Sequence, residues 1–271
     1  MNTNSNLYTV IYTTLIVVVV AAVLAVVSQS LKGRQEANEK ADTISQMMTA
    51  AGFGSKDEFG KIGNAAVLAR YAEEIDRAFV VGPDGQKVAD LPLEKVYSPS
   101  ELKKQNYNIK GADTPELPVF IFKNGVTVVP VYGAGLWGPV WGYIAFEPGS
   151  NVIKGAYFDH ESETAGLGAK IKDDPEFQHS FDGEMIDFAG VNPFDIVKGG
   201  APKDEAGKNL VDNKIDAITG ATMTSRGLEN AIDVWMATYA KYFLAEVEDS
   251  SDDVNANDDV NGDDAKEVKE D

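Results

Sequence analysis

Residues 118–132 read PVFIFKNGVTVVPVY. Two apolar runs rich in β-branched residues flank the pair Asn124-Gly125, and runs of this composition are typical of strands. An Asn-Gly pair between two strands supplies the positive φ angles of a type I′ hairpin turn. The stretch therefore predicts a β-hairpin in the middle of the chain.

Two further strand pairs are predicted on either side of this hairpin. Residues 79–81 and 87–88 flank the turn signal Pro83-Asp84-Gly85, and residues 141–146 pair with 151–158 across a short turn. Helical periodicity marks the segments 29–53, 65–78 and 225–244, the last with an apolar stripe at steps of three and four residues. Strands in the middle with helices around them predict an α+β domain rather than a regular βαβ repeat.

The N-terminal part predicts a membrane span. Residues 7–27 carry no charge, and at about 1.5 Å per residue they reach roughly 30 Å, the thickness of a bilayer core. The alternative is a cleaved signal peptide, but residues 1–6 lack the basic residues that such a peptide needs. We therefore expect a short segment 1–6 followed by a single transmembrane helix over 7–29.

The sequence does not decide the orientation of this span in the membrane. The flanking cations Lys32, Arg34 and Lys40 all follow the span, and the positive-inside rule would place the C-terminal part in the cytoplasm. Large domains translocate largely regardless of flanking charge, so the rule leaves the question open.

The charge composition limits the functions of the chain and separates a domain from an acidic tail. The 271 residues include 24 Lys+Arg and 43 Asp+Glu, a net charge of −19, which argues against binding to nucleic acid. Residues 246–271 hold twelve of the acidic residues against two lysines. Because this segment repels itself and has little apolar surface, it predicts a disordered acidic tail after a domain over 30–245.

Cysteine is absent, and the only histidines are His160 and His179. This excludes thiolate-held iron–sulfur clusters, cysteine zinc sites, thiol nucleophiles and disulfides. We predict no metal site, and any redox chemistry would belong to an organic cofactor.

The segment with most chemical information is residues 216–222, DAITGAT, just before the last predicted helix. A turn at a helix N-terminus presents backbone N–H groups and the positive end of the helix dipole, which favours a phosphate group. Thr222 can present its hydroxyl to such an anion. The alternative is structural, with Thr222, Thr224 and Ser225 as N-cap candidates.

This segment resembles the flavinylation motif Asp-x-x-(Ser/Thr)-Gly-Ala-(Ser/Thr), in which FMN is joined through its phosphate to the last hydroxyl. The matching residues are Asp216, Thr219, Gly220, Ala221 and Thr222. The resemblance implies a phosphoester on Thr222, formed by a separate flavin transferase that uses FAD as donor. Asp216 would either orient the acceptor or cap the turn.

Two other segments resemble FMN-binding domains of membrane redox pumps. Residues 160–168, HESETAGLG, are similar to a Glu-Thr-Pro-Gly-Leu-Gly loop that lies against the isoalloxazine ring, with Ala165 replacing the proline. The loop residues implied to bind the cofactor are Glu163, Thr164, Gly166, Leu167 and Gly168. Residues 133–138, GAGLWG, are similar to a Gly-x-Gly-Leu-Trp segment, so Trp137 packs either near the flavin or in the core.

Together these segments resemble the C subunits of the bacterial Na+-translocating NADH:quinone reductases (Na+-NQR), with the related G subunits of Rnf complexes as the near alternative. The resemblance implies an electron-transfer subunit of this translocase, with covalent FMN and no complete active site on this chain alone. The implied partners are the other Na+-NQR subunits, the flavin transferase and membrane lipid.

The resemblance implies a protein of the bacterial inner membrane whose domain lies in the periplasm. This orientation is opposite to the one that the flanking cations predict. An anchored binding or sensory module without flavin, and a cofactor-free structural subunit, remain alternatives.

Overall fold

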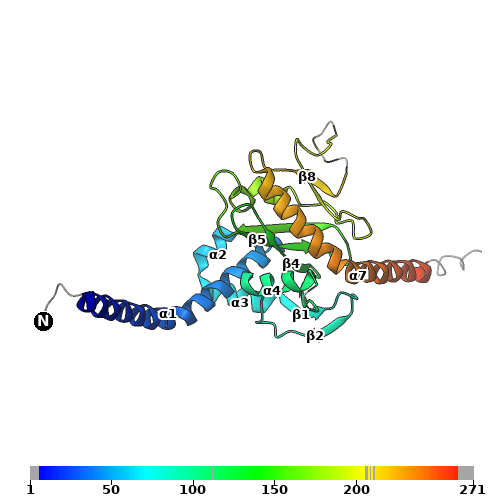
Figure 1. Cartoon of the computed structure of the whole chain (residues 1–271). Coiled ribbons are helices and arrows are strands. Elements are labelled where there is room, and N and C mark those ends of the chain that lie inside the picture. The colour runs from blue at the N-terminus through cyan, green and yellow to red at the C-terminus, as the bar shows by residue number, and fades with distance from the viewer. Residues whose placement is uncertain (1–5, 112, 205–206, 208, 210, 262–271) are drawn as a thin grey trace, which may run out of the picture.

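The computed structural model describes residues 6–111, 113–204, 207, 209 and 211–261 (Figure 1). Its centre is a six-stranded antiparallel sheet in the order β2-β1-β3-β4-β5-β6, and β7 and β8 form a separate parallel pair. The strands are β1 (Ile75–Val81), β2 (Lys87–Asp90), β3 (Leu117–Phe122), β4 (Thr127–Ala134), β5 (Pro139–Phe146), β6 (Ile153–His160), β7 (Asp195–Val197) and β8 (Lys214–Asp216). The helices are α1 (Asn6–Ala50), α2 (Lys56–Ile62), α3 (Asn64–Glu74), α4 (Pro99–Ile109), α5 (Lys170–Asp173), α6 (Pro175–His179) and α7 (Thr222–Asn261). The predicted α+β class is confirmed.

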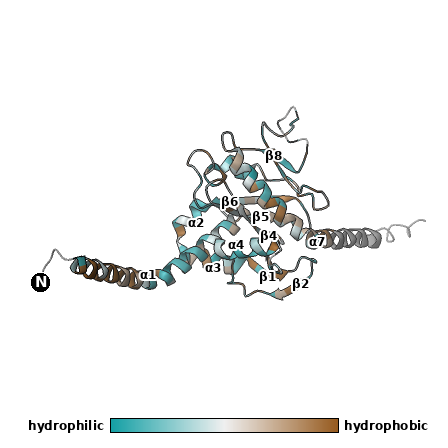
Figure 2. Cartoon of the chain, viewed as in Figure 1, coloured by the Kyte–Doolittle hydropathy of each residue, from teal (hydrophilic) through white to brown (hydrophobic). Residues whose placement is uncertain are grey.

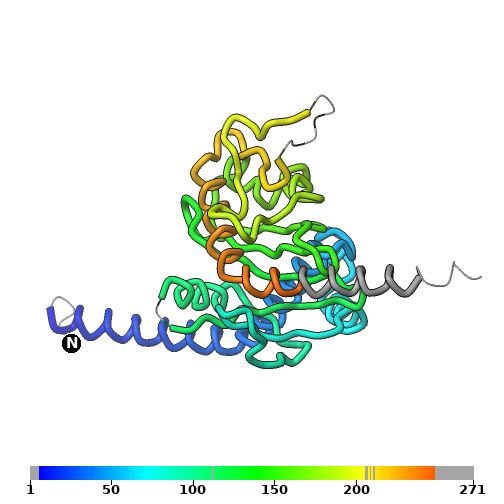
Figure 3. Tube along the Cα trace, turned by 90° about the vertical axis from the view of Figure 1, so that its right-hand side faces the viewer, coloured from blue at the N-terminus to red at the C-terminus, as the bar shows by residue number. Residues whose placement is uncertain are grey.

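Helix α1 joins an apolar N-terminal segment to the domain without a break. Its first part projects from the domain in two perpendicular views (Figures 1 and 3), and this part is strongly apolar (Figure 2). The helix is long and apolar enough to cross a membrane, with a mean hydropathy of 2.9 in its most apolar window. Ala41 is its first buried residue, so residues 28–40 separate the apolar segment from the core by about 20 Å of helix.

The predicted central hairpin is confirmed, but its turn type is wrong. β3 and β4 pair antiparallel, and the Phe122 N–H donates to the Val126 carbonyl across a three-residue loop. Gly125 has a φ of +82°, whereas Asn124 has a negative φ. The Gly125 N–H donates to the Phe122 carbonyl at 2.8 Å, so the loop is a type I turn closed by a left-handed glycine.

Several predicted boundaries differ from the observed ones, most clearly in two helices. The helix expected over 65–78 ends at Glu74, because Ile75 pairs with Phe122 and the chain enters the sheet as β1. The last helix begins at Thr222 rather than Ser225. It also continues to Asn261, beyond the position at which the sequence predicts the tail to begin; residues 262–271 of that tail lie outside the described residues.

Helices α1 and α7 cover opposite faces of the sheet. On β5, Trp141 donates from Nε1 to Gln46 of α1 at 3.2 Å. Its neighbour Val140 pairs with Gly133 of β4, and a Cβ on Gly133 would meet Ala231 of α7. Because adjacent residues of a strand point to opposite faces, these contacts place the two helices on the two sides.

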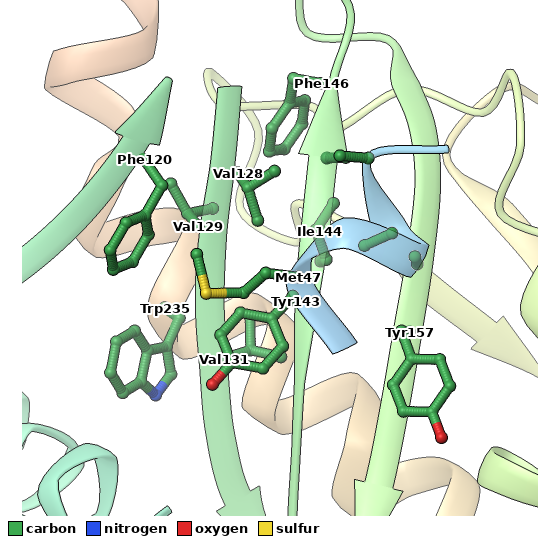
Figure 4. Close-up of a cluster of buried hydrophobic side chains, with 14 of the residues drawn as sticks. Met47, Phe120, Val128, Val129, Val131, Tyr143, Ile144, Phe146, Tyr157 and Trp235 are labelled. Carbon is green, nitrogen blue, oxygen red and sulfur yellow. The ribbon is translucent and has the colours of Figure 1, made fainter. Parts of the chain in front are cut away.

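The hydrophobic core lies between these layers. Figure 4 shows Met47 of α1 and Trp235 of α7 grouped with Val129, Val131 and Tyr143 of the central strands. Trp235 is fully buried, and its Nε1 donates to the Tyr132 carbonyl at 2.9 Å. The buried rings and branched side chains fix how α7 lies on the sheet, and therefore where its N-terminus points.

Carboxylates of α7 also hold strand β7. Asp233 accepts from the Phe194 N–H at 3.1 Å, and Glu229 accepts from the Ile196 N–H at 2.8 Å. Burial raises the pKa of Asp233 to about 6; the Phe194 hydrogen bond opposes this, and the charges of Glu229 and Asp195 add to it. The folded state therefore binds this proton more tightly than the unfolded chain.

We expect Asp233→Asn to stabilise the protein at neutral and alkaline pH. The stability that the protonated carboxyl contributes is complete below its ordinary pKa of 3.8 and is lost as pH rises through about 6. Asparagine keeps the acceptor for the Phe194 N–H and has no charge to desolvate. Because the carboxyl is only partly buried, solvent screening reduces the effect of the shift, and urea unfolding should give the variant an advantage of about 1 to 2 kcal/mol at about pH 8 that shrinks at about pH 5. An equal difference at both pH values would contradict this assignment.

Candidate functional site

Three segments that are distant in sequence meet at one end of the central sheet. The loop 135–138 connects β4 to β5, whose paired ends are Ala134 and Pro139. The loop 161–169 leaves β6 next to that point, since His160 pairs with Val140. The first turn of α7 approaches both loops from the face that it covers. The sequence predicted functional residues on each of these three segments.

Glu163 connects the three segments. Its Oε1 accepts from the Trp137 N–H at 2.9 Å, and its Oε2 accepts from the Thr224 hydroxyl at 2.7 Å. Its own N–H donates to His160 Nδ1 at 3.1 Å. A second link runs from the Ser162 hydroxyl to the Trp137 carbonyl at 2.8 Å. The loops and the helix are therefore held by specific hydrogen bonds.

Glycines allow the close approach of these segments. A Cβ on Gly135 would overlap Glu163 Oε1, and a Cβ on Gly168 would overlap Glu163 Oε2 and lie 2.6 Å from Thr224 Oγ1. A Cβ on Gly227 of α7 would overlap the Ala134 carbonyl. The two loops therefore contain glycines at positions where any side chain would collide with its neighbours. Gly168, which is one of the predicted site residues, is explained by this close packing.

The N-terminus of α7 carries no side-chain cap from its own turn. The Ala221 carbonyl accepts from the Ser225 N–H at 2.9 Å, so Ala221 occupies the N-cap position and has no oxygen to offer the free amides. The Ser225 hydroxyl instead accepts from the Ile218 N–H at 3.1 Å, and the Thr224 hydroxyl is engaged with Glu163. Among the hydrogen bonds of the described residues, none uses the N–H groups of Thr222, Met223 or Thr224.

The structural alternative, in which Thr222, Thr224 and Ser225 serve as N-caps, is therefore wrong. Thr222 is the first residue of the helix and is half-buried. Three free N–H groups and the positive end of a long helix dipole suit an anion at this position.

Exposed apolar side chains surround this helix end. Trp137 is 67% exposed, and the alternative of a buried core tryptophan at this position is wrong. Leu136, Leu167 and Met223 are also exposed large apolar residues, and Leu167 lies against Gly220. An apolar surface next to a free helix N-terminus fits a ligand that has a flat ring system and a phosphate group.

Asp216 is engaged elsewhere. It accepts from the Ala201 N–H at 2.7 Å and pairs with Lys203 Nζ at 2.7 Å. The hydrogen bond from Lys203 is the main cause that holds the pKa of Asp216 below its ordinary value. Asp216 thus fixes the 201–203 segment to β8, which favours the structural alternative for this residue.

The remaining predicted residues lie on the two turns. Thr219 and Gly220 are exposed in the turn before α7, and Gly220 has a φ of +82°, which strains any L side chain. Thr164 and Gly166 are exposed, and the Thr164 carbonyl accepts from the Leu167 and Ala169 N–H groups.

The sequence did not single out Leu136 or Met223, and it named Thr224 only as an N-cap candidate. Leu136 and Met223 belong to the apolar surface, and Thr224 forms the contact with Glu163. The two partners of that contact are 61 residues apart, and no local pattern signals such a pair. His160 accepts from the Glu163 N–H, while His179 is an exposed partner of Asp182.

The segments of the site are similar to a known family of domains. The FMN-binding domain family matches residues 135–237, a range that includes all three segments of the site.

Over these residues the chain is similar to FMN-binding domains.

Known proteins extend this similarity beyond the domain. The C subunit of the Na(+)-translocating NADH-quinone reductase of Vibrio vulnificus is 29% identical over 242 residues, which cover 84% of this chain and 89% of that protein. The crystal structure of the corresponding protein from Parabacteroides distasonis matches with a TM-score of 0.63 and 29% identity, covering 79% of this chain and 96% of that one. The crystal structure of NqrC from Shewanella oneidensis matches with a TM-score of 0.59 and 25% identity, covering 79% of this chain and 99% of that one. The resemblance that the sequence indicated is confirmed.

Proposed function

We propose that the chain carries FMN covalently, through a phosphoester between the flavin phosphate and the hydroxyl of Thr222. The observation that carries this proposal is the uncapped N-terminus of α7, with Thr222 as its first residue and an exposed apolar surface beside it. The free N–H groups would hold the phosphate, and the dipole of α7 would stabilise its charge. Trp137, Leu136, Leu167 and Met223 would cover the ring system.

The attachment would be made by a separate flavin transferase. The Thr222 hydroxyl oxygen would form a bond to the phosphorus on the riboflavin side of the FAD pyrophosphate, and the bond from that phosphorus to the bridging oxygen would break. AMP would leave with the bridging oxygen, and the hydroxyl proton would pass to a base or to solvent. No electron is gained or lost in this step. The exposed residues Thr219 and Gly220, with the buried Ala221 after them, would form the turn that the transferase recognises.

When bound, FMN supplies an isoalloxazine ring that accepts and donates electrons one or two at a time. The residues of this chain would hold that ring in place and limit its contact with water. The indole of Trp137 presents a flat face of suitable size, and its backbone position is set by Glu163 and Ser162. A covalent bond at Thr222 prevents loss of the cofactor from an exposed site.

We further propose that this chain is the C-type subunit of a Na+-NQR complex, in which it relays electrons between cofactors of partner subunits. Support comes from the relatives, which are named as subunits of the Na(+)-translocating NADH-quinone reductase and match most of this chain. The other subunits, the flavin transferase and membrane lipid would be its partners. Membership of an Rnf-type complex would appear instead as ferredoxin:NAD+ activity in membranes that contain this protein.

Expression of the full chain with and without a flavin transferase tests the cofactor proposal. Covalent flavin remains on a protein after denaturation, so a fluorescent band in a denaturing gel is expected only when the transferase is present. A band that never fluoresces would contradict the proposal and favour an anchored binding module or a structural subunit.

We propose that α1 anchors the chain in the bacterial inner membrane and that the domain lies on the periplasmic side. The exposed apolar residues of α1 before Lys32 support a single span, and the domain is large enough to translocate against the flanking cations. A C-terminal alkaline phosphatase fusion, which is active only outside the cytoplasm, should be active in cells. A matched fusion to green fluorescent protein, exported through the same route, should be dark, and the reverse pattern would contradict this orientation.

A further inference from the structure

The Glu163 carboxylate forms hydrogen bonds within the protein rather than facing a ligand. Glu163 is 8% exposed, in a loop where its neighbours Ser162 and Thr164 are both exposed. One carboxylate oxygen is occupied by the Trp137 N–H and the other by the Thr224 hydroxyl. Both oxygens thus point into the protein, toward groups of two other segments.

The two groups that Glu163 holds are the two ends of the proposed cofactor site. Thr224 is two residues after Thr222, in the first turn of α7, where the phosphate would be attached. Trp137 is the most exposed of the apolar residues beside that turn. The carboxylate therefore sets the distance between the attachment point and the surface that would receive the ring.

We propose that Glu163 is a positioning residue, which fixes the Trp137 surface relative to the N-terminus of α7 so that the tethered ring rests against the indole. This inference rests on the proposed function, because it assumes a flavin on Thr222. It changes the role of Glu163 from a direct contact with the cofactor, as the family resemblance implied, to a contact with the residues that hold it. Gly135 and Gly168 leave the space that the carboxylate fills.

Two substitutions of Glu163 distinguish the role of its two hydrogen bonds from the role of its negative charge. Glu163→Ala removes both acceptors and leaves the Trp137 N–H and the buried Thr224 hydroxyl without partners. Glu163→Gln has nearly the same shape; its amide oxygen can accept from Trp137, and its NH2 group can donate to the Thr224 oxygen after the hydroxyl rotates. Thr224→Val, with Thr224→Ser as its control, breaks one of the two contacts and leaves Glu163 in place.

The readout is the native-state fluorescence of attached flavin, because an indole stacked on the ring quenches it. Each variant is produced as the full chain with the transferase, and mass spectrometry gives the fraction that carries FMN. Per attached flavin, we expect Glu163→Ala to raise the fluorescence yield severalfold and to lower its anisotropy. Thr224→Val should change both in the same direction, whereas Glu163→Gln and Thr224→Ser should match the unchanged protein.

A purely structural role of Glu163 would lower the melting temperature but leave these optical properties of the loaded protein unchanged. Unchanged yield and anisotropy in loaded Glu163→Ala would overturn the inference; should that variant fail to fold, the same result in loaded Thr224→Val would overturn it. A Trp137→Ala background adds a second check, because Glu163→Ala should then produce no additional rise in yield. Absence of FMN from the unchanged protein is a different result, which contradicts the proposed function itself.

Discussion

Thr222→Ala is expected to abolish covalent flavin completely. The substitution removes the hydroxyl oxygen that would form the phosphoester, and alanine is a good helix former, so α7 should still begin at this position. The full chain, produced with the transferase, should run as a non-fluorescent band of normal abundance in a denaturing gel. Electron transfer from NADH to quinone in membranes that contain the variant should fall with it.

Two matched variants control this experiment. Thr222→Ser keeps a hydroxyl at the same position and should retain the fluorescent band, because the motif accepts either residue. Thr219→Ala removes an exposed hydroxyl from the same turn, three residues earlier, and tests whether that hydroxyl is the acceptor. Fluorescence that persists in Thr222→Ala but disappears in Thr219→Ala would move the attachment to Thr219.

Trp235→Ala is expected to produce the largest loss of folding stability. Trp235 is fully buried between α7 and β4, and its indole N–H donates to the Tyr132 carbonyl and to Asn106. Its removal leaves a large cavity and an unpaired buried carbonyl, and substitutions of this kind cost about 3 to 5 kcal/mol. A marginally stable domain would then be largely unfolded at growth temperature.

Trp137→Ala is the matched control for this loss. Trp137 is 67% exposed, so its removal should change the free energy of unfolding by no more than about 0.5 kcal/mol. Urea unfolding of the detergent-solubilised full chain, followed by far-ultraviolet circular dichroism, measures both variants. Equal stability of the two variants would contradict the assignment of Trp235 to the core and Trp137 to the site.

The fold was predictable where local patterns and burial agree. The strand pairs around Asn124-Gly125 and across residues 147–150 were predicted from apolar runs on either side of turn signals, and the helix over 225–244 from its apolar stripe. The prediction failed where pairing in three dimensions overrides local periodicity. Residues 75–78 continue a helical pattern, yet they pair with β3 and form part of the sheet.

The site was predictable as motifs but not as an arrangement. Resemblance indicated Thr222, Glu163 and Trp137 separately, and the structure brings their segments together. The exposure of Trp137 depends on where the β4–β5 loop ends, which composition does not reveal. The hydrogen bond between Glu163 and Thr224 joins buried polar groups that are far apart in sequence. Such a contact can be recognised only from the tertiary structure.

Mass spectrometry of one tryptic peptide tests the central proposal most directly. Cleavage after Lys214 and Arg226 releases residues 215–226, which contain Thr222 and the other hydroxyl residues Thr219, Thr224 and Ser225. In protein made with the transferase, this peptide should carry the mass of FMN less one water, and fragmentation should place the addition on Thr222. An unmodified peptide in protein made with an active transferase, or an addition on another residue, would contradict the account.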